Sequence, residues 1–359
     1  MIEHRAHEGA PQESTVFRPW QEIGVDLGTA TVLIYVKGKS IMLREPSVIA
    51  MVRDTGEVKA VGEEAYRMLG RTPGNIVAVR PMRDGVIADY DLTEKMLKAF
   101  VRKVVTGFGR FFKPHIMVCV PSGVTEVEKR AVLQATREVG ARKAFLIEEP
   151  LAAAVGAGVN IAEPTGSMIV DVGGGTTDVA VISLGGIVVS ESLRIAGNEF
   201  DEAIIRYIRH KENLLIGDRT AEEVKMKVGA AIIVRQDDVR KVEVRGRDLI
   251  NGLPKTVTVD TEDIADALKE PLQKIADGVR RVLELAPPEL VSDIIDRGII
   301  MTGGGALLRN FDALLRQTTG IPVAVAENAT DCVALGTGQA LDMLRVLQDA
   351  LISDSFLRR

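Results

Sequence analysis

The sequence has few cysteines, few aromatic residues and no long apolar run. Its 359 residues include two cysteines, Cys119 and Cys332, which cannot form a disulfide framework. Each lies in a short apolar stretch, so we expect both to be reduced thiols in the core of a cytoplasmic protein. No stretch approaches the roughly 18 to 20 consecutive apolar residues of a membrane-spanning helix, so any membrane contact is expected to be peripheral.

An excess of positive charge is also absent. The chain has 45 Lys and Arg against 50 Asp and Glu, a formal net charge of −5. This balance gives no overall basic charge to attract nucleic acid, and we expect no nucleic-acid partner. The composition is 46% hydrophobic and 26% charged, as in ordinary folded proteins. Residues 1–21 lack the apolar core of a signal peptide and are expected to form a disordered or loosely docked leader.

Two segments share the order strand, glycine turn, strand. They cover residues 23–36 and 168–182, and their aspartates Asp26 and Asp171 are 145 positions apart. A match of apolar strand, Asp, Gly, Thr and second strand favours a duplicated domain over chance similarity of two turns. Further strands are expected at 116–120, 144–147 and 298–302. Helical spacing is found at 92–105, 125–139, 201–210, 221–228, 264–285 and 340–351. Alternating helices and strands predict an α/β chain in two lobes.

Three glycine turns, at 26–31, 171–178 and 302–306, each follow an apolar strand. Glycine lets the backbone approach a phosphate closely, and successive N–H groups form an anion-binding nest. An aspartate at the strand end can hold hydrated Mg²⁺, which takes few direct carboxylate ligands. The other common phosphate-binding motifs, GxxxxGK[ST] and a GxGxxG between strand and helix, are absent. The three turns therefore predict a nucleotide held between two lobes.

These turns resemble those of the actin and heat-shock-chaperone ATPase superfamily, and further segments resemble the MreB family of bacterial actin-like cell-shape proteins. The similar segments are 45–48, 60–65, 68–75, 80–89, 120–123, 147–150, 244–249 and 332–336. The resemblance covers about residues 23–344. It implies an actin-like ATPase fold with two duplicated lobes built on RNase H-like cores, each with a smaller subdomain, and a nucleotide in the cleft between them.

The resemblance also implies domain boundaries. The leader would be residues 1–21. The first lobe would be 22–155, with its small subdomain at about 38–76. The second lobe would be 156–344, with its small subdomain at about 198–260. Residues 345–359 would form the end of a C-terminal helix and a tail.

Carried over by position, the resemblance implies ATP and Mg²⁺ as cofactors. Asp26 and Asp171 would face Mg²⁺, largely through water. Glu149 would orient the attacking water, with Thr177 and Asp178 as further catalytic candidates. The nucleotide-binding positions would be Asp26, Gly28, Thr29, Ala30, Thr31, Asp171, Gly173, Gly174, Gly175, Thr176, Glu222, Glu223, Val224, Lys225, Gly303, Gly304, Gly305 and Ala306.

Some of these residues have ordinary structural explanations. Glu222 and Lys225 are three positions apart, so they could form a solvated ion pair on one helix face. Glu149 could cap the helix that follows it. The chain also departs from the family pattern. Thr31 stands where Asn is usual, Asp178 where Glu is usual and Lys227 where an acid is usual.

An aromatic segment, residues 107–114, combines Phe108, Phe111 and Phe112 with Arg110 and Lys113. Aromatic side chains beside cations suit the headgroup region of a bilayer. The resembled family attaches to membranes through a small hydrophobic loop or an N-terminal amphipathic helix. We therefore expect a membrane-contacting loop here, in preference to a loop that buries its phenylalanines in the lobe.

The resemblance implies an ATP-dependent, membrane-associated filament protein that organises lateral cell-wall synthesis and maintains rod shape. Slow ATP hydrolysis would be coupled to polymerisation. The expected partners are further copies of the chain in paired protofilaments, the inner face of the cytoplasmic membrane and membrane proteins of the cell-elongation complex. A same-fold nucleotide-binding adaptor with little hydrolysis is an alternative that Asp178 keeps open. A small-molecule kinase would need a catalytic Asp beside a substrate pocket, and no convincing one is found.

Overall fold

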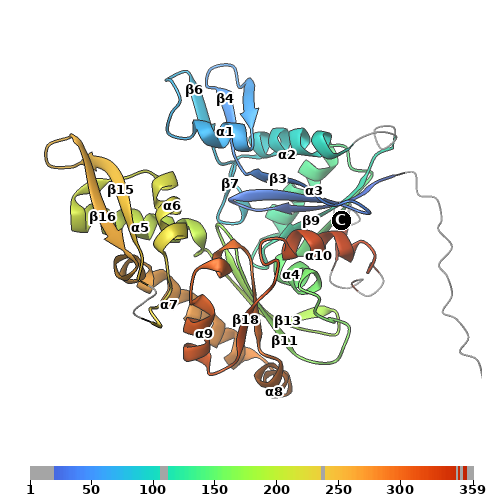
Figure 1. Cartoon of the computed structure of the whole chain (residues 1–359). Helices are drawn as coiled ribbons and strands as arrows, with labels where there is room; N and C mark the ends of the chain where they lie inside the picture. Colours follow the sequence, from blue (N-terminus) through green and yellow to red (C-terminus); the bar gives the residue numbers. More distant parts are fainter. Residues whose placement is uncertain (1–19, 106–111, 236–238, 345–346, 348–350, 354–359) are drawn as a thin grey trace, which may run out of the picture.

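The computed structural model describes residues 20–105, 112–235, 239–344, 347 and 351–353 (Figure 1). The first lobe is built on a six-stranded sheet of order β19-β10-β9-β1-β2-β3. Its strands are β1 (Glu22–Leu27), β2 (Thr31–Val36), β3 (Ser40–Pro46), β9 (His115–Val120), β10 (Lys143–Glu148) and β19 (Ile352–Ser353). The strand β1 runs antiparallel to β2 and parallel to β9.

Helices cover both faces of this sheet. Two of them, α2 (Tyr90–Val104) and α3 (Glu126–Glu138), pack together, and α3 also contacts β9 and β10. The apolar residues of α2 recur at helical spacing and are buried, as the sequence predicts. On the other side, α4 (Glu149–Gly156) packs against α10 (Cys332–Ala340), which also contacts β1.

A small subdomain projects from the first lobe, at the top of Figure 1. It is a three-stranded sheet of order β5-β4-β6, covered by a short helix. Its elements are β4 (Ile49–Val52), β5 (Val58–Val61), α1 (Glu63–Met68) and β6 (Ile76–Val79). A two-stranded hairpin, β7 (Met82–Arg83) and β8 (Val86–Ile87), leads back to the lobe.

The second lobe contains a five-stranded sheet of order β13-β12-β11-β17-β18. Its strands are β11 (Ser167–Val172), β12 (Thr177–Ser183), β13 (Gly186–Leu193), β17 (Ile299–Thr302) and β18 (Val323–Val325). Its helices are α5 (Gly197–Glu212), α7 (Thr261–Leu285), α8 (Pro288–Arg297), the 3-10 helix η3 (Gly304–Leu307) and α9 (Phe311–Thr319). A small sheet of β14 (Leu214–Leu215), β15 (Lys241–Asp248) and β16 (Pro254–Asp260) lies beside α6 (Asp218–Val228).

The predicted duplication is confirmed at the level of strand pairing. The strand β11 is antiparallel to β12 and parallel to β17, just as β1 is antiparallel to β2 and parallel to β9. Asp26 lies opposite Leu33, and Asp171 lies opposite Asp178, seven residues further along in both cases. The two lobes therefore hold their glycine turns at equivalent sheet edges.

The C-terminal end of the chain differs from the sequence prediction. A helix was expected at 340–351, but α10 ends at Ala340, and the strand β19 pairs with β10. The chain thus returns to the first lobe after residue 344, the predicted end of the second lobe. Small residues explain the packing of α10, because a Cβ at Gly336 would lie 1.8 Å from the carbonyl oxygen of Ala152 in α4. Both cysteines are free and buried, as expected.

Candidate functional site

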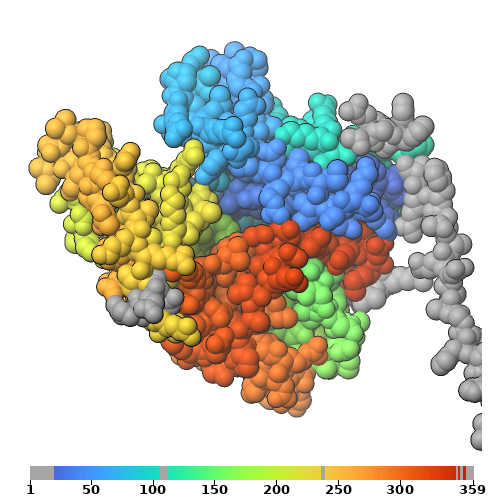
Figure 2. Space-filling model, in the orientation of Figure 1, coloured from blue at the N-terminus to red at the C-terminus, as the bar shows by residue number. Residues whose placement is uncertain are grey.

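A cavity of about 480 Å³ lies between the two lobes. It is lined by the glycine turn between β1 and β2, the glycine turn between β11 and β12, and the third turn that begins η3. In Figure 2 the small subdomains of the lobes form separate projections with a notch between them. The cavity contains these predicted residues: Asp26, Gly28, Thr29, Ala30, Thr31, Glu149, Asp171, Gly173, Gly174, Gly175, Thr176, Glu222, Lys225, Gly303, Gly304 and Gly305.

The first two turns touch each other across the cleft. A Cβ at Gly174 would lie 2.5 Å from the Cβ of Ala30, and one at Gly175 would lie 2.5 Å from Oγ1 of Thr29. Real side chains do not approach so closely, so both glycines are required for this contact. The same hydroxyl of Thr29 accepts a hydrogen bond from the Gly85 amide at 2.9 Å. The glycine backbone of the second lobe therefore packs directly against Ala30 and Thr29 of the first lobe.

Two aspartates lie where strands β1 and β11 reach the cavity. Asp171 accepts a hydrogen bond from the Thr302 hydroxyl at 2.7 Å, and Asp26 accepts one from the Cys119 thiol at 3.4 Å. Burial raises the pKa of Asp171 to about 7 and that of Asp26 to about 6. A cation placed beside them would favour their charged forms.

The donor set suits one class of metal ion. Within residues 20–105, 112–235, 239–344, 347 and 351–353, no group of three or more His, Cys, Asp or Glu side chains could hold a metal ion. Zinc-type cages need such groups, whereas Mg²⁺ keeps several waters and takes one or two carboxylates. Asp26 and Asp171 fit hydrated Mg²⁺.

Glu149 is the first residue of α4 and lines the cavity. Burial, followed by repulsion from Asp178, raises the pKa of the Glu149 carboxyl well above its usual range. The alternative role as a helix cap is not what the structure shows. Glu148 occupies the capping position, and its side chain forms no capping hydrogen bond.

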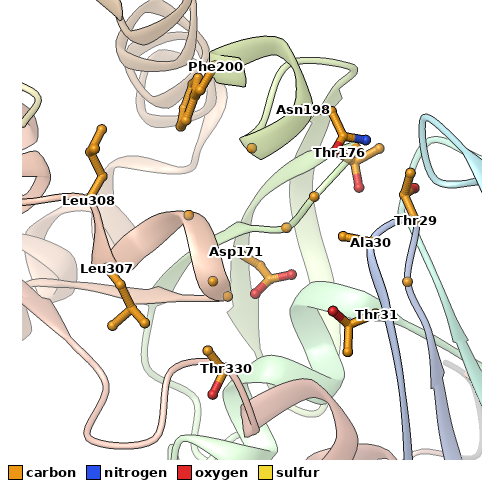
Figure 3. Close-up of a pocket in the computed structure, with 18 of the residues that line it drawn as sticks. Thr29, Ala30, Thr31, Asp171, Thr176, Asn198, Phe200, Leu307, Leu308 and Thr330 are labelled. Carbon is orange, nitrogen blue, oxygen red and sulfur yellow. The ribbon is translucent and has the colours of Figure 1, made fainter. Parts of the chain in front are cut away.

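The two ends of the cavity differ in chemistry (Figure 3). Leu307 and Leu308 lie on one side, and Phe200 lies at the top of the view, between Leu308 and Asn198. Thr29 and Thr31 lie on the opposite side, and the Asp171 carboxylate points into the space between the two sides. The cavity therefore fits an elongated ligand with one apolar end and one anionic end.

Glu222 and Lys225 do not act as a simple surface pair. The Tyr66 hydroxyl, from α1 of the opposite lobe, donates to Oε2 of Glu222 at 2.6 Å. Lys225 forms an ion pair with Asp201 at 2.8 Å and donates to the carbonyl of Gly197 at 2.9 Å. Both side chains are thus held at the cavity wall by partners from other elements.

Several predicted residues lie outside the cavity. Thr177 donates to the carbonyl of Ile195 at 2.6 Å, and Asp178 accepts from the amide and the hydroxyl of Ser122, both at 2.9 Å. The other residues that do not line the cavity are Glu223, Val224 and Ala306. Glu223 faces Arg219 and Lys227 on the exposed side of α6, and Val224 and Ala306 are buried.

A family model described as the MreB/Mbl protein matches residues 20–349. The chain belongs to the MreB/Mbl family. It is 51% identical over 333 residues to the cell shape-determining protein Mbl of Bacillus subtilis (strain 168), covering 93% of this chain and 99% of that protein. It is 53% identical over 337 residues to the cell shape-determining protein MreB of Escherichia coli (strain K12), covering 93% and 96%.

Solved structures show the same actin-like fold. MreB5 of Spiroplasma citri bound to AMPPNP has a TM-score of 0.85 at 40% identity, covering 92% of this chain and 98% of that chain. The same protein bound to ADP has a TM-score of 0.84, covering 90% and 98%. A MamK double helical filament, at 23% identity, has a TM-score of 0.75, covering 90% and 98%, and shows the fold alone.

The structure of this MreB/Mbl chain also shows cavity residues that the sequence analysis missed. Arg44, Asn198, Asp201 and Thr330 line the cavity. The backbone N–H of Asn198 donates to the carbonyl of Gly174 at 2.8 Å, because the first turn of α5 lies against the second glycine turn. A Gly-Asn pair at the start of an amphipathic helix was the available sequence signal. Nothing in the local pattern marks Arg44 or Thr330.

The predicted membrane loop of this MreB/Mbl chain falls mostly outside the described residues. Phe108 and Phe111 lie outside them. Phe112 is described and is 42% exposed, and Lys113 beside it is exposed as well. Among the described helices, none is long and apolar enough to cross a membrane.

Proposed function

We propose that this protein binds Mg²⁺-ATP between its lobes and hydrolyses it slowly during filament turnover. The observation that carries the proposal is the pair of equivalent glycine turns, each with a strand-end aspartate, in contact around one cavity. Backbone N–H groups and threonine hydroxyls of both turns would hold the phosphates. The nucleotide-bound structures of a 40% identical relative support this placement.

Each wall of the cavity has a separate task in this proposal. Asp26 and Asp171 would hold the waters of Mg²⁺, which when bound neutralises phosphate charge. Leu307, Leu308 and Phe200 would pack against the nucleoside, while Glu222 and Lys225 lie nearby as hydrogen-bonding groups. Glu149 would orient the attacking water and accept its proton.

At the level of the cell, we propose that the chain forms actin-like filaments that maintain rod shape and organise lateral cell-wall synthesis. Two relatives that are about half identical to this chain are named cell shape-determining proteins, which supports the role in shape. The filaments would lie on the inner face of the cytoplasmic membrane, held by Phe108, Phe111 and Phe112. Their expected partners are membrane proteins of the cell-elongation complex. A single loop with two or three phenylalanines gains a few kcal/mol, so firm attachment requires repetition along a polymer.

Nucleotide affinity with and without Mg²⁺ tests the proposal directly. Wild type should bind ATP more tightly with Mg²⁺, and Asp171→Ala should lose most of that gain while retaining metal-free binding. Equal loss in both conditions would contradict the metal role of Asp171. Electron microscopy with ATP and anionic liposomes tests filament formation and attachment. The double variant Phe111→Ser with Phe112→Ser should abolish pelleting with liposomes at an unchanged melting temperature.

A second candidate is an adaptor that binds nucleotide and hydrolyses little. The hydrogen bonds of Thr177 and Asp178 favour it, because both side chains bond to groups away from the cavity. Of the three predicted catalytic residues, Glu149 then remains at the cavity. Phosphate release measured during assembly separates the two functions. Filaments that form with ATP and release no phosphate would establish the adaptor.

A further inference from the structure

The aspartate of the second lobe has a hydrogen-bond donor on the neighbouring strand. Asp171 of β11 lies directly opposite Thr302 of the parallel strand β17. The Thr302 hydroxyl is fully buried and donates to Oδ1 of Asp171 at 2.7 Å. A β-branched side chain has a restricted χ1 angle, so this donor is held in place by its own stiffness.

The first lobe repeats the arrangement with a different chemical group. Val25 of β1 lies opposite Val118 of the parallel strand β9, so Asp26 and Cys119 come next in register. The Cys119 thiol is buried and donates to Oδ1 of Asp26 at 3.4 Å. Both aspartates thus receive a hydrogen bond from the same position of the duplicated sheet.

The space around Asp171 is also kept clear. Thr302 is followed by Gly303, whose φ of 82° is in the left-handed region. A Cβ at Gly303 would lie 3.0 Å from Oδ1 of Asp171 and 2.3 Å from the carbonyl oxygen of Val172. The third glycine turn therefore lets its preceding threonine reach the carboxylate without crowding it.

A carboxylate at a cavity wall can rotate about its last side-chain torsion, and a hydrogen bond to one oxygen restricts that rotation. A hydroxyl at 2.7 Å is a strong donor to a carboxylate, whereas a thiol is a weak donor. The two halves of the site should therefore hold their carboxylates with unequal strength.

We propose that Thr302 and Cys119 are positioning residues that orient Asp171 and Asp26 toward hydrated Mg²⁺, with Thr302 the stronger of the two. This inference rests on the proposed Mg²⁺-ATP function. The side chains of Thr302 and Cys119 touch neither metal nor nucleotide in this role, and they act only through the carboxylates.

The test uses the full chain and follows fluorescent ATP binding as Mg²⁺ is added. Thr302→Val removes the hydroxyl at nearly constant volume, and Thr302→Ser restores it. The matched control is Thr136→Val in α3, where the buried hydroxyl donates to the carbonyl of Val132 at 2.7 Å, away from the cavity. Melting temperatures of all variants report on folding.

Thr302→Val should raise the Mg²⁺ concentration at half-saturation about ten-fold, which corresponds to the lower end of the loss for one hydrogen bond to a charged group. Metal-free ATP binding should be unchanged, and Thr302→Ser should return to within about two-fold of wild type. Cys119→Ala should give a smaller shift in the same direction, since a thiol is the weaker donor.

Several outcomes would overturn the inference. Thr302→Val could weaken ATP binding equally with and without Mg²⁺, which would indicate a structural role. Thr136→Val could give the same Mg²⁺ shift, or Thr302→Ser could fail to restore it. If wild type itself shows no Mg²⁺ dependence, the proposed function fails and the inference fails with it. A normal wild-type response with an unshifted Thr302→Val overturns the inference alone.

Discussion

The two lobes contribute turns of equal length to the cavity, and their side chains differ at most positions. Residues 26–33 and 171–178 each run from a strand-end aspartate through a glycine turn into an antiparallel strand. At the last position of these segments, the first lobe has Leu33, which lines the cavity, and the second has Asp178, which bonds to Ser122 of the first lobe. Duplication thus reproduces the backbone, while the contacts between the lobes depend on the positions that differ.

The helices that follow the sheets differ in the same way. α4 begins with Glu149 and α10 begins with Cys332, and the two helices pack against each other beneath the cavity. Only the first-lobe helix brings a carboxylate to the cavity from its first residue. The second lobe supplies Thr330 and Val333 at the corresponding end. One half of the site therefore holds the candidate base, and the other supplies the more glycine-rich turn.

Glu149→Gln should give the largest effect, because it removes the group that has no counterpart in the second lobe. Phosphate release should fall by roughly 10² to 10⁴, the range for a lost general base. ATP binding should remain, and filaments should persist longer. Glu148→Gln is the matched control, since Glu148 is half-buried and does not line the cavity. Unchanged phosphate release in Glu149→Gln would remove Glu149 from the mechanism.

Gly174→Ala should give the next largest effect, since the added methyl would meet the Cβ of Ala30 at 2.5 Å. Overpacking typically costs about 1 to 3 kcal/mol, which is about 5-fold to 150-fold in ATP affinity if it opposes closure alone. Adding Ala30→Gly should recover most of the loss. Calorimetry of ATP binding measures both. A double variant as weak as the single one would show that the turns do not need this contact.

The sequence predicts the parts of this site that repeat. Alternating apolar strands ending in Asp-x-Gly mark both halves of the sheet edge, so the fold and the glycine turns follow from local patterns. The helix α10 does not follow from a local pattern, because residues 332–340 are small or apolar and are buried on nearly every side. Without a polar face they show no helical period.

Contacts between the lobes are also beyond local patterns. Ser122 lies 56 residues before Asp178, and Tyr66 lies 156 residues before Glu222. Nothing in a window of ten or twenty residues signals either pair. The sequence analysis therefore placed Asp178 at the cavity, whereas its carboxylate is held by the other lobe.

Ser122→Ala should lower stability by about 1.5 to 3 kcal/mol, because the buried Asp178 carboxylate loses one of its two donors from Ser122. Asp178→Asn and the double variant complete a mutant cycle, in which the second change should cost less once the first is made. Urea unfolding monitored by circular dichroism measures the free energies. Strictly additive losses would show that the two side chains do not stabilise the lobe contact together.

Tyr66→Phe should give the smallest effect, at the outer end of the cleft. Burial and then the Glu222 carboxylate raise the pKa of Tyr66 to about 12, so the phenol remains a donor near neutral pH. The variant loses the 2.6 Å bond to Glu222 but keeps the ring, which lies 5.8 Å from the Arg80 guanidinium and 6.0 Å from that of Arg219. Because this bond is only partly buried, water screens the carboxylate, and the bond is worth about as much as an ordinary hydrogen bond, about 0.5 to 1.5 kcal/mol. ATP should therefore dissociate about two-fold to ten-fold faster.

The matched control for this change is Tyr90→Phe. The Tyr90 hydroxyl also donates to a glutamate, Oε2 of Glu138 at 3.0 Å, but both residues belong to the first lobe. Stopped-flow measurement of labelled ATP release compares the two variants at equal melting temperature. If Tyr90→Phe accelerates release as much as Tyr66→Phe, loss of any tyrosine–glutamate bond loosens the protein. If only Tyr66→Phe accelerates release, the bond between the lobes holds the cleft closed over the nucleotide. A side chain of the first lobe would then control ATP release through its bond to a glutamate of the second lobe.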